Sequence, residues 1–291
     1  MSRVLVTGAS GFVGTAVVDA LRAFGHQARG VTRAETGELS AVTEWSRLLD
    51  NVEAVVHCAG RAHVPFVRGI DPMPEARRVN CDATLALART AASRGLRRMI
   101  FMSTAHVNGS ETHGAPFKAS DTPAPHSPYA LTKNEAELGL RAIAAETGLD
   151  VVIIRPPLVL GRDPKGNLAS LLNMMRQGLP LPFGLVTRNR RDLVSLTTLT
   201  DLIRICVDHP AAAGATLLVS DGIARSTRAI CEELARLSGV VPRFLPVPPF
   251  ALDAALTLLG KTAMTSQLLG DLEIDIGATK TLLSWAPPEL H

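Results

Sequence analysis

The sequence is poor in cysteine and aromatic residues, and it contains no long apolar run. Its 4 cysteines in 291 residues lack CxxC or metal-ligand spacing, so we expect reduced core thiols, with no disulfide and no metal site. No stretch reaches the roughly 18 uninterrupted apolar residues of a membrane span, so no membrane insertion is expected. Asp253 and Lys261 interrupt the apolar stretch at residues 250–269, which favours a packed pair of helices.

Neither sign of charge dominates the chain. The net charge is +3 and aromatic residues make up 4%, whereas nucleic-acid-binding proteins cluster positive charge around stacking aromatic side chains. We therefore expect no nucleic acid as a partner. The N-terminus runs directly into a strand-like segment, without the charged, apolar and small-residue regions of a signal peptide, and this predicts a cytoplasmic protein.

The first half of the chain alternates short β-branched runs with helical patterns, which is typical of βαβ units. Strands are expected at 4–7, 27–32, 54–58, 99–103, 151–155, 193–196 and 215–219, and helices at 14–24, 43–49, 79–94, 129–147 and 201–207. The pattern predicts an α/β fold with a doubly wound parallel sheet (Rossmann) and a smaller C-terminal substrate lobe.

Prolines and glycines are frequent in the segment after Arg155. This change of composition suggests that the chain forms a domain and a separate lobe. We expect residues 1–156 and 192–220 to form the dinucleotide-binding domain, and residues 157–191 and 221–291 to form the substrate-binding lobe. Both long central helices carry apolar stripes. These stripes are either core alone or, where surplus, a homodimer interface through the helices at 79–94 and 129–147.

The segment VLVTGASGFVG places Gly8, Gly11 and Gly14 between a strand and a helix. The first glycine permits the tight turn, the second lets the backbone approach a pyrophosphate, and the third lets the helix pack against the strand. The helix N-terminus then faces the phosphates. This spacing predicts a dinucleotide site, which also includes the backbone of Ser10, Phe12 and Val13.

Tyr129 is the single tyrosine of the chain and precedes Lys133 by four residues. On a helix this spacing puts both side chains on one face. There the ammonium, helped by an oxidised nicotinamide, can lower the phenol pKa and make Tyr129 a usable acid or base. Thr104, at a predicted strand end, is the candidate to polarise the reacting carbonyl or hydroxyl, and it is to be distinguished from its neighbour Ser103.

The end of the second predicted strand bears on the cofactor. Enzymes that prefer NAD usually place a carboxylate there to bind the adenosine ribose, but this sequence has Thr32 followed by Arg33. A guanidinium suits a 2′-phosphate. We therefore expect NADP, while Glu35 leaves NAD possible.

These motifs resemble the extended short-chain dehydrogenase/reductase family, in its nucleotide-sugar epimerase, dehydratase and reductase branch. The resemblance covers roughly residues 1–220 and implies a catalytic trio of Thr104, Tyr129 and Lys133. It also implies that Lys133 binds the nicotinamide ribose. Further cofactor contacts are implied at Glu38 and Leu39 beside the adenine, at Ala59 and Gly60 beneath the cofactor, and at Asn80 in the following helix.

The resemblance also implies a nucleotide-sugar substrate. Arg191 in NRRDLVSL matches an arginine that binds the sugar-nucleotide diphosphate, and Asn167 lies in a KGN segment similar to a substrate loop of bacterial 4-keto-reductases. Ala105 and His106 replace the Asp-Glu pair of dehydratases, which argues against water elimination and places His106 among the substrate contacts. Leu158 replaces an asparagine that contacts the diphosphate.

Four functions are compatible with these residues. The leading expectation is NADP-dependent reduction at C4 of a nucleotide-activated hexose, such as a UDP-linked 4-keto-6-deoxy-N-acetylhexose. The main alternative is an NAD-dependent UDP-hexose 4-epimerase, which would use the same trio. A reductase of non-nucleotide carbonyl compounds and a non-catalytic dinucleotide sensor are minor alternatives.

Overall fold

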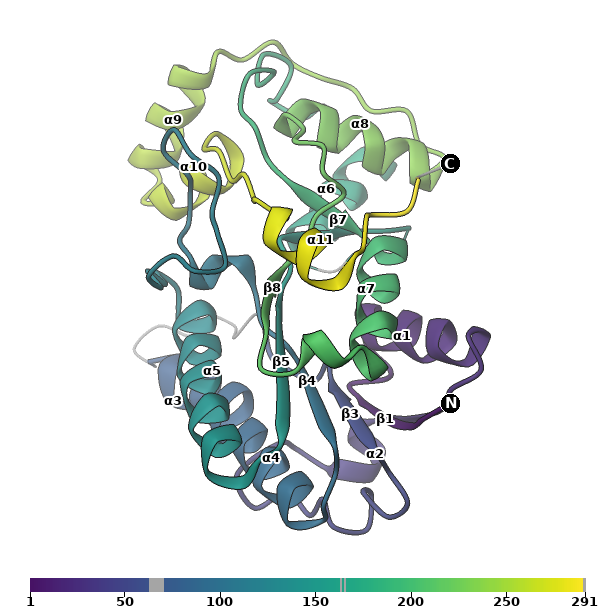
Figure 1. Ribbon diagram of the computed structural model, residues 1–291. Helices are drawn as coiled ribbons and strands as arrows, with labels where there is room; N and C mark the ends of the chain where they lie inside the picture. The colour runs from purple at the N-terminus through teal and green to yellow at the C-terminus, as the bar shows by residue number, and fades with distance from the viewer. Residues whose placement is uncertain (63–70, 163, 165, 290–291) are drawn as a thin grey trace.

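A central parallel sheet organises the protein (Figure 1). The computed structural model describes residues 1–62, 71–162, 164 and 166–289. Six strands lie in the order β2-β1-β3-β4-β5-β8, and each neighbouring pair is parallel. The strands are β1 (Arg3–Thr7), β2 (Gln27–Val31), β3 (Ala54–His57), β4 (Arg98–Met102), β5 (Asp150–Arg155) and β8 (Thr216–Leu218). The predicted α/β fold with a doubly wound sheet is confirmed.

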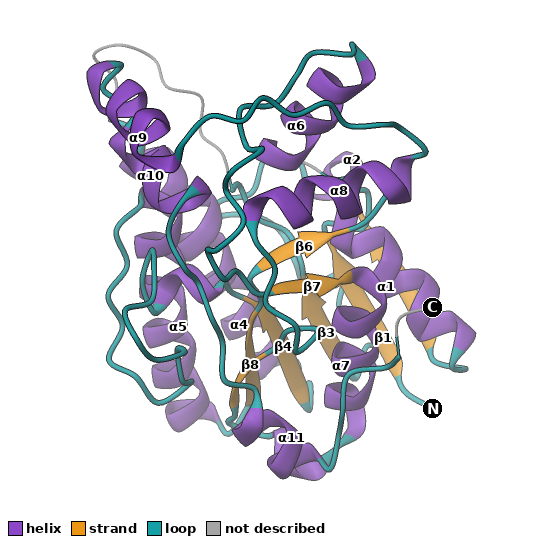
Figure 2. Ribbon diagram, turned by 90° about the horizontal axis from the view of Figure 1, so that it is seen from above, coloured by secondary structure: helices purple, strands orange, loops and turns teal. Residues whose placement is uncertain are grey.

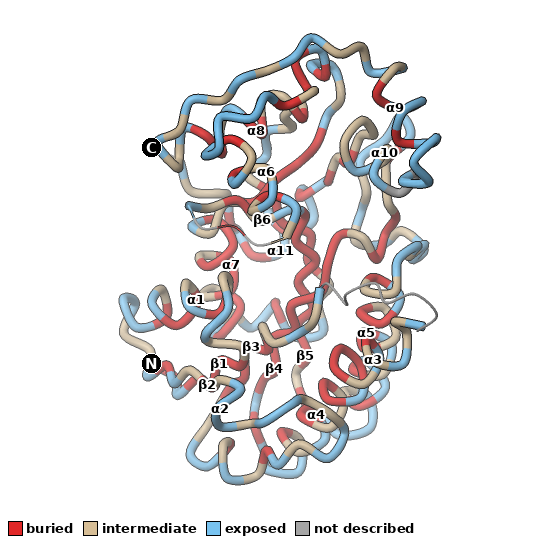
Figure 3. The backbone as a smooth tube through the Cα atoms, turned by 180° about the vertical axis from the view of Figure 1, so that it is seen from behind, coloured by how far each residue is buried: buried red, intermediate tan, exposed pale blue. Residues whose placement is uncertain are grey.

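Helices cover both faces of the sheet, because alternate strand residues point to opposite sides. In β1, Val4 and Val6 join one core, and Leu5 joins the other. The first core includes α1 (Phe12–Ala23), α7 (Leu196–Asp208) and α11 (Gly277–Leu283), and the second includes α4 (Ala83–Ser93) and α5 (Pro128–Thr147). Figure 3 shows the buried strands between the partly exposed helices. All four cysteines are free thiols, as expected.

A smaller group of elements lies above the body that contains the sheet (Figures 1 and 2). It has its own apolar cluster, which includes residues of α6 (Gly166–Arg176), α8 (Thr227–Ser238) and α9 (Pro249–Leu258). The expected helix pair at 250–269 is present as α9 and α10 (Thr262–Leu268), which contact each other. β6 (Leu158–Leu160) pairs with β7 (Leu193–Ser195) outside the main sheet. The domain boundaries given above stay a prediction.

The predicted helix at 43–49 is wrong. Residues 46–50 form turns, in which Trp45 O accepts hydrogen bonds from the backbone N–H groups of both Leu48 and Leu49. The Glu44 carboxylate accepts a bond from Ser46 N at 2.9 Å. Such local side-chain bonds compete with helix formation, while Trp45 and Leu49 are buried in the core without helical backbone.

The predicted helix at 79–94 is divided into two kinds of helix. α3 (Met73–Arg77) runs into the π-helical turn η1 (Arg78–Asp82), and α4 follows directly. Short helical turns also occur at α2 (Arg33–Thr36), η2 (Ala105–Val107) and η3 (Pro210–Ala212). π-turns often lie at functional sites, and η1 carries the predicted cofactor residue Asn80.

The sheet order locates the expected ligand crevice. β2 lies on one side of β1 and β3 on the other, so the chain reverses its direction of winding at this point. Ligands of open α/β sheets bind beyond the carboxyl ends of strands at such a switch point. Gly8 follows β1, Ala59 follows β3 and Thr104 follows β4, so the fold brings three predicted site segments to one edge of the sheet.

Candidate active site

The turn after β1 requires glycine at the predicted positions. Gly8 has φ +68°, and a Cβ there would lie 2.8 Å from the backbone N of Ala59. A Cβ at Gly14 would lie 2.1 Å from the Gly8 carbonyl oxygen. Gly11 is the N-cap of α1, and its N–H donates to Gly8 O at 2.9 Å. The turn therefore has the close backbone packing that a phosphate-binding helix start requires.

The rest of the turn leads into α1. Ser10 is exposed, while Phe12 and Val13 are half-buried. The Phe12 ring closely approaches the backbone of Gly161, where an added Cβ would lie 2.7 Å from the ring. The turn is thereby packed against the segment that follows β6.

A network of buried polar groups fixes the loop that follows β3, on the other side of the expected dinucleotide site. Asn80 Oδ1 accepts from Arg61 N at 2.7 Å, and its Nδ2 donates to Arg61 O at 3.1 Å and to Thr132 Oγ1 at 3.2 Å. A Cβ on Gly60 would lie 3.3 Å from both Asn80 Oδ1 and Lys133 Nζ. Asn80 thus orders the Ala59–Arg61 loop, whose Gly60 leaves a gap beside Lys133.

His57 connects the elements around the predicted cofactor site, a role that was not predicted from its sequence context. Its Nδ1 lies 2.7 Å from Thr7 Oγ1, and its Nε2 lies 3.0 Å from Thr84 Oγ1. Burial lowers the pKa of His57 to about 3, with a smaller effect of the Lys133 charge, so the ring is neutral. Thr7 Oγ1 also accepts from Ala59 N at 3.3 Å. His57 therefore links the glycine turn to the opposite loop. The available signal was its position directly before the predicted cofactor segment, in the sequence HCAG at residues 57–60.

The predicted adenosine end lies beyond β2. Thr32 caps α2 in a capping box with Glu35, and the Glu35 carboxylate also pairs with Arg29 at 3.2 Å. Arg33 is exposed and pairs with Glu38 at 3.1 Å. Leu39 is half-buried, and its carbonyl accepts from Arg78 at 2.7 Å. The guanidinium expected to bind a 2′-phosphate thus already faces a carboxylate.

The three predicted catalytic residues come from α5 and the end of β4. Tyr129 and Lys133 share one face of α5, with Lys133 Nζ 5.8 Å from the centre of the Tyr129 ring and 4.4 Å from that of Phe101. Lys133 Nζ donates to Met102 O at 2.7 Å. Thr104, two residues further along, is buried, and its Oγ1 accepts from His106 N at 3.3 Å. The strand end and the helix are thus tied together beside the crevice.

Burial dominates the proton affinities of this pair. It raises the pKa of Tyr129 to about 12 and lowers the pKa of Lys133 to about 8. The expected lowering of the phenol pKa is therefore not produced in the protein alone, because burial is the cause that acts on Tyr129 and it raises the pKa. The positive charge of an oxidised nicotinamide is the additional contribution on which that expectation relied.

Replacing Lys133 by methionine is expected to stabilise the cofactor-free protein while abolishing activity. Below about pH 8 the buried Lys133 ammonium lowers the unfolding free energy of the wild-type protein. This loss of stability diminishes as pH rises from about 8 to 10.5, the usual pKa of lysine, because the folded state loses its proton first. We expect Lys133→Met to raise unfolding free energy by about 1–3 kcal/mol at pH 7. The gain should shrink above pH 8 in denaturant titrations. A Lys133→Met protein less stable than wild type at pH 7 would contradict this.

The predicted substrate residues lie between the sheet edge and the smaller lobe. Arg191 is largely buried and donates through Nη1 to Ser266 O at 2.9 Å and Gly270 O at 2.7 Å. Burial lowers the pKa of His106, and the nearby Arg191 charge lowers it further. His106 and Arg191 therefore lie near each other, with Thr104 bonded to the His106 backbone.

The remaining residues of the predicted substrate site are more exposed to solvent. Asn167 is exposed in the first turn of α6 and donates to Gln267 Oε1 at 3.0 Å. Lys165 of the KGN segment lies outside the described residues. Leu158, which replaces the family asparagine, begins β6 and is exposed. No role of these residues follows from their contacts alone.

Comparison with known proteins identifies the family. The model of the NAD dependent epimerase/dehydratase family matches residues 4–218. The chain belongs to this family. It is an enzyme of the extended short-chain dehydrogenase/reductase type, as the sequence motifs predicted. No helix in the described ranges is long and apolar enough to cross a membrane.

Individual proteins are similar to this chain in sequence or in fold. The chain is 41% identical to a UDP-glucose 4-epimerase of Vibrio cholerae over 98% of this chain and 91% of the relative. A 2-alkyl-3-oxoalkanoate reductase of Stenotrophomonas maltophilia is 29% identical over 60% of this chain and 56% of its own length. The fold is similar to a UDP-glucose 4-epimerase with UDP-glucose from Thermotoga maritima, with TM-score 0.77, 22% identity and coverage of 99% and 94% of the two chains.

Proposed function

We propose that this family member interconverts C4 epimers of a UDP-hexose, with NAD as its resident cofactor. The 41% identity to the Vibrio cholerae UDP-glucose 4-epimerase, over nearly the whole of both chains, carries this proposal. The arrangement of Tyr129, Lys133 and Thr104 beside the crevice supports it, because C4 chemistry needs a proton carrier and a group that polarises the C4 oxygen. We assign these roles to Tyr129 and Thr104.

The residues present fit a dinucleotide. The close packing around Gly8 and Gly14 leaves no room for a Cβ, and the N-terminus of α1 offers backbone N–H groups to a pyrophosphate. NAD is favoured over the NADP that Arg33 suggested, because the matching family model is that of NAD dependent enzymes. The pair between Arg33 and Glu38 is exposed and contributes at most about 1 kcal/mol against a 2′-phosphate. NAD is also the dinucleotide bound in a UDP-glucuronic acid 4-epimerase of similar fold from Bacillus cereus.

The chemistry assigned to the chain is a reversible proton transfer. Bound NAD supplies hydride acceptance and return at C4 of the sugar. Tyr129 takes the proton of the 4-hydroxyl and later returns it, while the Lys133 ammonium stabilises the phenolate. Thr104 donates a hydrogen bond to the C4 oxygen. Inversion would require the 4-keto sugar to turn its opposite face toward the dinucleotide before hydride is returned, because the face of C4 that receives the hydride sets the configuration.

Net reduction of a 4-keto sugar, the leading expectation from the sequence, has weaker support than epimerisation. The 41% identity to a UDP-glucose 4-epimerase favours epimerisation instead. The NADP preference that favoured reduction rested on Arg33, whereas the matching family model is that of NAD dependent enzymes. Both reactions would use the same three side chains, so the trio does not separate them.

The proposal is tested by the fate of the cofactor and the substrate together. The purified protein is denatured and its released nucleotide is identified by mass, and the intact protein is incubated with UDP-glucose, UDP-galactose or UDP-N-acetylglucosamine without added cofactor. We expect retained NAD and formation of the 4-epimer, detected by NMR. Net NADPH oxidation with a UDP-4-keto-6-deoxy-N-acetylhexosamine, without epimerisation of these hexoses, would replace the proposal by the reductase function.

Replacing Arg191 by leucine is expected to weaken substrate binding. A charge-assisted hydrogen bond to a diphosphate contributes about 1.5–3 kcal/mol, so KM for the UDP-hexose should rise about 10- to 100-fold with kcat little changed. The neighbouring Arg190 is exposed and pairs with Glu273 at 2.7 Å, and Arg190→Leu provides the matched control with KM within about threefold of wild type. Equal KM changes in both variants would remove Arg191 from the diphosphate site.

A further inference from the structure

A second polar cluster lies behind the predicted catalytic trio. Its centre is Glu137, a fully buried glutamate on α5. Tyr129, Lys133 and Glu137 follow one another at four-residue spacing, so they share one face of the helix. The reaction proposed above makes no use of Glu137, and its complete burial requires an explanation, because a buried charge is costly unless it is paired.

The Glu137 carboxylate accepts four hydrogen bonds. Oε1 accepts from Ser103 Oγ at 2.5 Å and from Arg155 Nε at 2.9 Å. Oε2 accepts from Arg155 Nη2 at 2.6 Å and from Arg141 Nη2 at 3.0 Å. Arg155 is also almost completely buried, and its Nη1 donates to Asn108 Oδ1 at 3.0 Å. Each carboxylate oxygen thus has two donors, and the guanidinium binds the carboxylate through two nitrogens.

The cluster joins α5 to the ends of two neighbouring strands. Ser103 follows β4 and directly precedes Thr104, while Arg155 is the last residue of β5. The backbone completes the junction, since Ser103 N donates to Ile154 O and Ala105 N donates to Pro156 O, each at 2.8 Å. The helix that carries Tyr129 and Lys133 is therefore fixed to the strand end that carries Thr104.

Stability alone does not account for this ion pair. The desolvation of two buried charges offsets much of their attraction, and well-packed apolar residues of similar volume often replace such a pair at no cost in stability. What an apolar pair lacks is the direction of its hydrogen bonds. Reaction rates depend strongly on the placement of catalytic groups, and an error of about 1 Å can cost about 100-fold.

We propose that Glu137 is a positioning residue: through Ser103 and Arg155 it fixes α5, with Tyr129 and Lys133, relative to Thr104. Its kinetic consequences rest on the function proposed above. The geometry itself does not, since the four hydrogen bonds belong to the chain alone.

The charges around Lys133 agree with this role. Burial lowers the pKa of Lys133, and the Glu137 carboxylate opposes that effect. Among the residues that the structure describes, Cys58, Tyr129 and His57 also lie near the ammonium. These three are uncharged at neutral pH, because burial raises the pKa of the Cys58 thiol and of Tyr129 to about 12 each and lowers that of His57 to about 3. Glu137 therefore favours the charged form of Lys133 at its buried position.

Two variants separate positioning from stability. Glu137→Gln removes the charge, and the Glu137→Leu/Arg155→Met double variant replaces the pair by apolar side chains. In both NAD-loaded proteins we expect kcat to fall about 10- to 100-fold with KM unchanged within about twofold. The basic limb of the pH–kcat profile should move to lower pH, because Lys133 loses its proton more readily without the nearby carboxylate.

The single tyrosine of the chain provides a readout that needs no activity. The ultraviolet difference spectrum of the phenolate reports Tyr129 alone, and its midpoint in the NAD-loaded variants should rise by about one pH unit relative to wild type. A shifted midpoint without epimerase activity in wild type would retain the positioning role and reject the proposed function. Unchanged kcat and an unchanged midpoint in a folded variant would overturn the positioning role.

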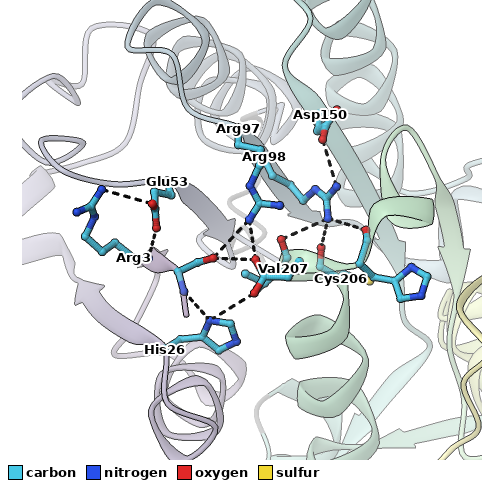
Figure 4. A network of polar contacts seen from close by, with 11 residues as sticks. Arg3, His26, Glu53, Arg97, Arg98, Asp150, Cys206 and Val207 are labelled. Atoms are coloured by element: carbon cyan, nitrogen blue, oxygen red, sulfur yellow. Dashed lines mark hydrogen bonds and ion pairs between the residues drawn. The ribbon is translucent and has the colours of Figure 1, made fainter.

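A control pair lies at the opposite ends of the same strands (Figure 4). Arg98, at the start of β4, is buried, pairs with Asp150 at 3.1 Å and donates to the carbonyls of Cys206 and His209 at 2.8 Å each. Arg98→Met should lower the melting temperature without moving kcat or the tyrosine midpoint. If neither Glu137 variant folds, Ser103→Ala decides, since loss of its hydroxyl should still lower kcat about threefold or more; unchanged kcat would overturn the proposal.

Discussion

Replacing Tyr129 by phenylalanine is expected to reduce turnover at least about 100-fold while leaving NAD bound. The substitution removes the proton carrier and keeps the ring, and general acid–base catalysis contributes about 10²–10⁴-fold. Lys133 keeps its hydrogen bond to Met102 O and its contact with Phe101, so the surrounding structure should persist. Steady-state assays with UDP-galactose measure kcat and KM, and mass analysis of the released nucleotide measures NAD content.

The kinetic parameters that change in Tyr129→Phe are as informative as the size of the change. We expect kcat and kcat/KM to fall together, because the lost interaction acts on the transferring proton rather than on substrate binding. Circular dichroism and the melting temperature control for folding. A Tyr129→Phe enzyme within a few-fold of wild-type kcat would assign the proton transfer to another group.

Replacing Gly14 by alanine is expected to cause the largest loss of cofactor. A Cβ at this position would lie 2.1 Å from the Gly8 carbonyl oxygen and 2.7 Å from its carbon, so α1 must move away from the glycine turn. Overpacking of this kind costs about 1–3 kcal/mol or more. It exceeds the roughly 1 kcal/mol that alanine gains over glycine in a helix. We expect the purified variant to contain no NAD and to bind added NAD at least about 100-fold more weakly, as measured by calorimetry.

A second helical glycine provides the matched control. At Gly139 in α5, the Cβ would meet the terminal methyl groups of Leu85 at 2.6 and 2.7 Å, and a flexible side chain can move where a carbonyl of the turn cannot. Gly139→Ala should therefore keep its NAD. Full NAD occupancy in Gly14→Ala would contradict the assignment of this turn to the pyrophosphate.

The parts of the fold that follow from local pattern were predictable from the sequence. Buried parallel strands read as short apolar runs, and β3 and β5 are such runs. The glycine turn was predictable because each glycine meets a specific steric demand, and the pairing of Tyr129 with Lys133 follows from the helical repeat. The segment at 43–49 failed because side-chain hydrogen bonds and the burial of Trp45 override its helical spacing.

Contacts between distant segments were not predictable from spacing. Nothing local connects Glu137 with Arg155 and Ser103, and the pair between Arg33 and Glu38 depends on the turn that follows α2. The choice between epimerisation and reduction is harder still. It depends on whether the 4-keto sugar can rotate in the site and whether the dinucleotide stays bound. Both reactions make the same use of Thr104, Tyr129 and Lys133, so these residues do not distinguish them.

The π-turn η1 has a consequence for the architecture of the cofactor wall. A π-turn contains about one residue more than an α-turn, so it offsets the side-chain phase of α4 from that of α3 by about 100°. α3 can then pair with α5 through Arg77 and Glu135, while α4 directs Leu87 and Ala91 into the core beneath the sheet. Deleting one residue from 78–82 would bring the two helices into a common phase. The face of α4 that now buries Leu87 and Ala91 would then turn by about 100° away from the core that it shares with α5 and the sheet.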